Sequence, residues 1–262
     1  MLIIRFFVFF LFFPFFLYAK SLIVTSVYPL KLILKEILPE NITVYNAVPE
    51  NANPHFFEVT PKSSIIIRKA TAFVGVQKDF DGWIENFLPE NAKVLYLNRN
   101  SENPHIWLSP KFIIKNLNII SNFFCSIFPK EKNIIIKKAK SFRIKLENLI
   151  YKFQFNNLKI VELHPAWDYF ANDFGINIIG CLIQSEHNDI SIKRALKLMK
   201  LVKKEKVKFI LASKNIHSNF LKTFAKQMNL KIIYINPLGE GENNYLDFIK
   251  NICKKIKQES IQ

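Results

Sequence analysis

Glycine and cysteine are scarce in this chain of 262 residues, which has six glycines and three cysteines. Gly239 and Gly241 lack the third glycine of a dinucleotide-binding loop and lie beside acidic residues, so a nucleotide site is not expected. The three cysteines, Cys125, Cys181 and Cys253, are too few and too widely spaced for a disulfide framework. In an exported protein, two of them could form one disulfide bond. The standard serine-nucleophile and zinc-protease signatures are also missing. These absences argue against several common enzyme classes.

A long apolar run occurs only at the start of the chain. Residues 1–19 contain one charge, Arg5, then a phenylalanine-rich apolar stretch that ends at Tyr18-Ala19. A basic start, an apolar centre and a small final residue predict a cleavable signal peptide and a periplasmic protein. An uncleaved anchor is the alternative, because about 18 apolar residues would just span a bilayer. No cysteine follows the run, so a lipoprotein anchor is not expected.

The charge is strongly positive, with 37 Lys and Arg against 21 Asp and Glu and a formal net charge of +16. Such a balance raises the question of nucleic acid or anionic lipid. The lysines are spread along the chain, however, and Lys, Ile, Asn and Phe are all abundant. A composition bias of the whole proteome explains this pattern better, and no nucleic-acid partner is expected.

Short apolar runs alternate with helical patterns through both halves of the chain. Strands are predicted at 22–27, 42–47, 71–76, 94–97, 158–163, 176–182, 207–212 and 232–235. Helices are predicted at 29–38, from a cap at Thr60, at 79–88, from a cap at Ser109 to 128, at 166–174, from a cap at Asp189 to 205, at 218–230 and at 245–257. The alternation predicts an α/β fold with two lobes, each with a parallel sheet flanked by helices.

One long amphipathic helix is predicted in the middle of the chain. Its apolar residues, which include Ile135, Ala139, Phe142 and Leu146, recur at intervals of three and four without glycine or proline. A helix of this kind is a candidate rigid connector. The predicted organisation is a signal peptide at 1–19, an N-terminal lobe at 20–129, a connecting helix at 130–154 and a C-terminal lobe at 155–262.

Three of the five histidines have matching neighbours. They occur in Asn53-Pro54-His55, in Asn103-Pro104-His105 and in His164-Pro165, and each follows a predicted strand directly or by a loop. Proline stiffens each corner, and ligands collect at the carboxyl ends of parallel strands. A single histidine is more often structural, but three together predict a metal site. His187 and His217 lie in polar segments and are predicted to be solvated surface residues.

Four motifs in order carry a family resemblance. They are Asn53-Pro54-His55-Phe56-Phe57-Glu58, Asn103-Pro104-His105-Ile106-Trp107, His164-Pro165-Ala166-Trp167 and Asn236-Pro237-Leu238-Gly239. The chain resembles the metal-binding solute-binding proteins of bacterial zinc and manganese ABC importers. The resemblance implies two lobes joined by a long helix, with the ion between them and His55, His105 and His164 as ligands. It also implies a monomer without catalytic activity, which serves an inner-membrane permease that has a separate ATPase.

The fourth ligand position departs from the family pattern. The family commonly has aspartate where this chain has Asn236, and a neutral amide is a poorer zinc ligand than a carboxylate. Water, the Asn236 carbonyl or a nearby carboxylate such as Glu162 are the alternatives, and Glu162 is equally suited to hold an imidazole tautomer. Three imidazoles favour Zn²⁺ as the transported ion, with Mn²⁺ as the alternative. The His-rich loop of many zinc members is absent, because residues 98–102 are too few for it.

Two other functions compete with metal capture. A zinc hydrolase would use the same histidines to hold a metal-bound water, with Glu58 or Glu162 as the general base. Neither glutamate lies in a recognised catalytic motif. An adhesin that kept the fold and lost the metal is the second alternative, and Asn236 is its only support. Retention of a transition metal by the purified chain separates this alternative from the transport hypothesis.

Overall fold

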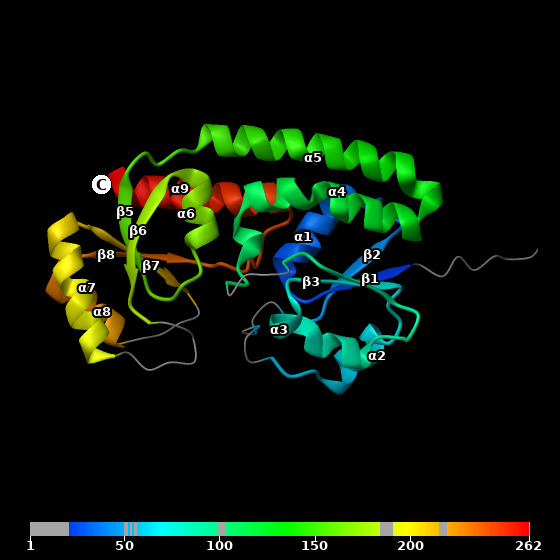
Figure 1. Cartoon of the computed structure of the whole chain (residues 1–262), viewed down its shortest axis with the longest axis horizontal. Coiled ribbons are helices and arrows are strands. Elements are labelled where there is room, and N and C mark those ends of the chain that lie inside the picture. The colour runs from blue at the N-terminus through cyan, green and yellow to red at the C-terminus, as the bar shows by residue number, and fades with distance from the viewer. Residues whose placement is uncertain are drawn as a thin grey trace, which may run out of the picture.

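The computed structural model describes residues 21–49, 52, 54, 57–98, 103–183, 191–214 and 219–261. Two lobes lie side by side, and long helices run along one edge of both (Figure 1). The predicted signal peptide, His55, His187, His217 and the predicted helix cap Asp189 lie outside the described residues. Within the described ranges, no helix has both the length and the apolar character that a membrane crossing requires.

The N-terminal lobe is built on a sheet of four parallel strands in the order β2-β1-β3-β4. The two central strands are almost wholly buried, as expected for a parallel sheet covered by helices, while the two edge strands are only partly buried. The strands are β1 (Leu22–Thr25), β2 (Thr43–Asn46), β3 (Ala72–Gly75) and β4 (Lys93–Tyr96), and the first helices are α1 (Tyr28–Ile37), α2 (Pro61–Ile67) and α3 (Lys78–Asp81).

The C-terminal lobe repeats this design with the strand order β6-β5-β7-β8, again all parallel. Each strand order is the same when counted from the first strand of its lobe. The strands are β5 (Leu158–Glu162), β6 (Ile176–Cys181), β7 (Phe209–Ser213) and β8 (Lys231–Ile235), and the helices are α6 (Asp168–Phe174), α7 (Ile192–Glu205), α8 (Asn219–Met228) and α9 (Tyr245–Ile261). The predicted α/β fold with two parallel sheets is therefore confirmed.

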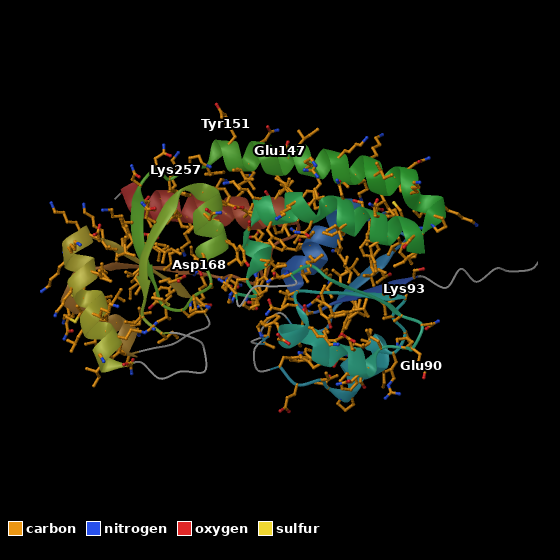
Figure 2. All side chains as sticks on the ribbon, viewed as in Figure 1. Glu90, Lys93, Glu147, Tyr151, Asp168 and Lys257 are labelled. Carbon is orange, nitrogen blue, oxygen red and sulfur yellow. The ribbon has the colours of Figure 1, made fainter. Side chains whose placement is uncertain are left out.

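Two helices, α4 (Pro110–Ile127) and α5 (Lys132–Lys152), come after β4 in the chain, with a short 3₁₀ turn, η3 (Pro129–Glu131), between them. The stripe of α5 that includes Ile135, Phe142 and Leu146 is buried, while Glu147 and Tyr151 lie on its outer side (Figure 2). Helix α9 contacts both α1 and α5, and the rings of Phe142 and Tyr245 lie 5.9 Å apart. One apolar cluster of the described residues therefore extends through both lobes, and each lobe also has a smaller cluster of its own.

Most helix boundaries agree with the sequence predictions, and two differ. The side chains of Thr60 and Ser109 accept hydrogen bonds at the starts of α2 and α4, as predicted. The helix predicted at 79–88 is instead α3 followed by a 3₁₀ helix, η1 (Gly82–Phe87). Asp81, at the junction, accepts hydrogen bonds from the backbone N–H groups of Val76 and Gln77, which pulls the chain back towards the sheet. Ser191, rather than Asp189, occupies the N-cap position of α7.

Candidate metal site

His105 lies in the loop after β4, and its ring orientation is fixed by Asn103. The Asn103 Oδ1 atom accepts from the His105 backbone N–H at 3.0 Å and from the imidazole Nδ1 at 2.8 Å, and its Nδ2 donates to Asp168 Oδ2 at 3.0 Å. Opposite partners on the two ends of the amide fix which end is oxygen. Because Oδ1 only accepts, Nδ1 carries the proton and Nε2 carries the lone pair that a metal ion needs.

His164 comes from the other lobe, two residues after the end of β5, and is 2% exposed with both ring nitrogens buried. The centres of the His105 and His164 rings lie 5.6 Å apart at an angle of 72°. Two imidazoles that bind one zinc ion tetrahedrally, with nitrogens about 2.0 Å from the metal, have ring centres roughly 5 Å apart. The two lobes thus bring two of the three predicted histidines to a distance that suits one ion.

Glu162, proposed from the sequence as a ligand or a supporting residue, is 2% exposed and accepts a hydrogen bond from the Trp167 backbone N–H at 3.1 Å. This bond closes the turn that presents His164. Burial, followed by the negative charge of Asp168, raises the pKa of Glu162 to about 8. The carboxyl group is therefore protonated at neutral pH, which suits a residue that supports the turn.

Asn236 follows β8, and both ends of its amide are bonded. Its Oδ1 accepts from the Leu238 backbone N–H at 2.9 Å, and its Nδ2 donates to Glu240 Oε2 at 3.0 Å. The turn is joined to the His105 loop, because Trp107 Nε1 donates to the Pro237 carbonyl at 2.8 Å. The Trp107 ring lies 5.1 Å from the His105 ring. Asn236 therefore belongs to the same junction between the lobes.

Further hydrogen bonds cross from one lobe to the other. Ser109 Oγ donates to Asp173 Oδ2 at 2.8 Å, and Tyr28 Oη donates to the Glu242 carbonyl at 2.8 Å. Tyr245 Oη, on α9, donates to the Trp107 carbonyl at 2.8 Å. Asp168, the partner of Asn103, is on the C-terminal lobe (Figure 2). These bonds predict a junction whose side chains are ordered before an ion arrives.

His55 lies outside the described residues, and the part of the chain that the structure describes contains no cluster of three His, Cys, Asp or Glu side chains suited to a metal. Its neighbour Pro54 lines a cavity of about 10 Å³ together with Tyr28 and Leu238. Pro54 therefore lies near Leu238, two residues after Asn236. Glu58, the base suggested for a hydrolase, is exposed, and Cys125, Cys181 and Cys253 are all unpaired thiols.

Sequence reasoning missed the supporting residues of this junction. From the sequence, Asn103 is predicted only as part of a motif, and no role at the site is predicted for Asp168 or Glu240. The signal that could have found them is the dipeptide Asn-Pro, which occurs at 53–54, 103–104 and 236–237. Asn followed by Pro favours a turn in which the asparagine side chain bonds to the backbone two residues on. Partners distant in sequence, such as Asp168, leave no local signal.

Two similar α/β lobes, with one histidine from each at a buried junction, form the two-lobed architecture of a solute-binding protein. The family model for the periplasmic zinc-uptake complex component A, ZnuA, matches residues 23–259. The chain therefore belongs to this family, whose members are metal-binding solute-binding proteins of zinc and manganese ABC importers.

Several known proteins are similar over most of the chain. A putative metal-binding protein of Thermotoga maritima is 25% identical over 251 residues, which cover 90% of this chain and 91% of that protein. The zinc-binding lipoprotein AdcA of Streptococcus pneumoniae is 23% identical over 93% of this chain, which spans only 56% of AdcA. A crystal structure of ZnuA superposes with a TM-score of 0.80 at 20% identity, covering 92% of this chain and 99% of that one.

Proposed function

We propose that this protein captures a divalent metal ion, Zn²⁺ in preference to Mn²⁺, in the periplasm and delivers it to an ABC permease that has a separate ATPase. His55, His105, His164 and Asn236 are the proposed ligands. The observation that carries the proposal is the pairing of His105 and His164 across the lobes, 5.6 Å apart, with the His105 tautomer fixed for metal binding. The chain itself performs no reaction and acts as a monomer.

Ligand chemistry supports zinc as the cargo. Three neutral imidazoles and one amide oxygen form a nitrogen-rich set, whereas manganese prefers oxygen ligands. Manganese or iron remains the alternative cargo within the same family. The proposal keeps the organisation predicted from the sequence, namely a cleaved signal peptide at 1–19, lobes at 20–129 and 155–262, and a connecting helix at 130–154. The stiffness of the connecting helix predicts modest movement of the lobes when the ion binds.

Competitive titration of the metal-stripped chain with zinc and manganese tests the proposal. We expect one tightly bound zinc per chain and weaker binding of manganese. His105→Ala removes a proposed ligand and should weaken zinc binding by on the order of 100-fold or more. Loss of a residue that only hydrogen-bonds to a metal ligand already lowers metal affinity about 10- to 100-fold. His187→Ala, at a histidine predicted to be solvated, is the matched control. Absence of zinc binding by the unmodified chain would refute metal capture.

The pH dependence of the same titration is a second test. Imidazole binds a metal only in its neutral form, so protons compete with zinc for the Nε2 atoms. Zinc affinity should therefore fall as the pH drops through about 6.5, the ordinary pKa of histidine. An affinity that stays constant from pH 7.5 to pH 5.5 would contradict a site made of histidines.

A further inference from the structure

We propose that Glu240 is a positioning residue of the metal site, which turns the Asn236 amide so that Oδ1 faces the ion and places a carboxyl group behind the neutral amide. The inference rests on the proposed function. Asn236 is neutral, and the carboxyl group of Glu240, four residues along the chain, bonds to the nitrogen end of its amide.

The hydrogen bonds of Asn236 give the amide one orientation. Glu240 Oε2 accepts from Nδ2 at 3.0 Å, which places the nitrogen on the Glu240 side, and the Leu238 N–H donates to Oδ1 at 2.9 Å. A carbonyl oxygen has two lone pairs, and the Leu238 N–H uses one. The second lone pair is the one that we assign to the metal ion. Without Glu240, the amide would lose the partner that distinguishes its two ends.

The same arrangement occurs at Asn103 within this molecule. There too, Oδ1 accepts from the backbone N–H two residues on, and Nδ2 donates to a carboxylate, that of Asp168, at 3.0 Å. The second lone pair of the Asn103 Oδ1 atom takes the Nδ1–H group of His105. In both turns a carboxylate orients an amide whose oxygen then serves the junction. The Asn103 turn shows that this geometry is stable.

The backbone after Asn236 is shaped to bring Glu240 back to the amide. Gly239 has φ +65°, which an L side chain rarely adopts, and a Cβ atom there would lie 2.9 Å from the Phe248 ring. The Glu240 Oε1 atom is buried, so little water competes with the Asn236 amide for this carboxyl group. A carboxylate that accepts from an amide N–H makes a stronger bond than a neutral acceptor does. Its field also favours a cation at the amide oxygen.

Zinc affinity of four chains tests this role: the unmodified chain, Glu240→Gln, the double variant Asn236→Asp/Glu240→Gln, and Glu242→Gln. We expect Glu240→Gln to bind zinc about 10-fold more weakly, within the range measured for outer partners of metal ligands. The double variant returns the carboxylate to position 236 and should recover the affinity to within about 3-fold. Glu242, in the same loop, bonds to Asn251 at 3.0 and 3.1 Å and is the control, with no expected effect.

Three results would overturn the inference. They are an unchanged affinity in Glu240→Gln, a double variant as weak as Glu240→Gln, and an equal loss in Glu242→Gln. Glu240→Gln made in an Asn236→Ala chain separates a positioning role from direct ligation by Glu240. If Glu240 were itself a ligand, its substitution would still weaken zinc binding after the amide is removed. A purely structural role would not be rescued by moving the carboxylate. If the unmodified chain binds no zinc, the proposed function fails first, and the two failures remain distinguishable.

Discussion

The loops after the fourth strand of each lobe use one turn for two purposes. Asn103 and Asn236 each accept a backbone N–H two residues on and each donate to a carboxylate at 3.0 Å. In the first turn the third residue is His105, and the asparagine supports the imidazole. In the second turn the third residue is Leu238, which is apolar, so the oxygen of the Asn236 side chain is the polar group that this turn presents. One side chain therefore decides whether the turn presents an imidazole or an amide.

The lobes also differ in the carboxyl group that each buries near its strand ends. Asp81 accepts from the Val76 and Gln77 N–H groups at 2.6 and 3.1 Å, and its pKa is raised by burial to about 6. Glu162 is equally buried, and burial raises its pKa further, to about 8. Asp168 adds to the rise in the pKa of Glu162, and hydrogen bonds from backbone N–H groups limit the rise at both carboxyl groups. The neighbouring groups thus determine which carboxyl group stays protonated at neutral pH.

The largest expected effect concerns Glu162. Its pKa is higher in the folded chain than the ordinary 4.5, so the folded state binds more protons and stability falls as the pH rises from about 4.5 to about 8. At about 1.36 kcal/mol per pH unit, the metal-free chain should lose about 3 kcal/mol between pH 5.5 and pH 8. Glu162→Gln should remove most of this loss in urea unfolding.

Asp81→Asn is the control for this effect. The pKa of Asp81 is near 6, so its contribution falls off between about 3.8 and 6 and leaves the slope above pH 6 in place. Asn would also turn an N–H₂ group towards one of the two backbone donors, a cost that the removal of a buried charge offsets above pH 6. A slope above pH 6 that survives Glu162→Gln and disappears in Asp81→Asn would reverse the comparison.

The second effect concerns Asn103. Asn103→Ala removes the acceptor that fixes the His105 tautomer and the bond to Asp168, and zinc affinity should fall 10- to 100-fold by competitive titration. Asn41→Ala is the matched control, since Asn41 also donates to a carboxylate, that of Glu131, at an exposed position far along the chain. If Asn103→Ala lowers zinc affinity less than Asn236→Ala does, the Asn236 amide oxygen matters more for binding than the orientation of His105 by Asn103.

The smallest effect compares two helix caps. Thr60 and Ser109 both cap helices, but Ser109 also donates to the buried Asp173 of the other lobe. Thr60→Ala should cost about 1 kcal/mol of unfolding free energy, and Ser109→Ala should cost about 2 to 3 kcal/mol because a bond to a carboxylate is lost as well. Urea unfolding measures both. Equal costs would mean that the Ser109 bond between the lobes adds no stability.

The fold was predictable because its determinants are local. Strand and helix alternation, the caps at Thr60 and Ser109, and the stripe of α5 are all visible in short windows of sequence, and they gave the elements within a few residues. The split at Asp81 was not visible, because it depends on hydrogen bonds from Val76 and Gln77 in the folded loop.

The candidate site was predictable only in part. The histidine motifs pointed to His105 and His164, which the structure brings together, while His55 and the full ligand set stay predictions. The bonds of Asn103 to Asp168 and of Trp107 to Pro237 join residues 65 and 130 positions apart. Such pairings depend on how the lobes dock, and nothing in a local window encodes them. The bond of Asn236 to Glu240 is local, and an Asn-Pro turn with a nearby acid is a signal worth searching for.

The last helix of the chain completes the first lobe. Tyr245 of α9 packs on Phe142 of α5, and α9 also covers α1 near the N-terminus. An exported chain must therefore emerge almost completely before its first lobe has a finished core. Folding of the two lobes is thereby coupled, and calorimetry should show one unfolding transition instead of two. Disruption of α9 should therefore unfold both lobes together, because this helix packs on elements of each lobe.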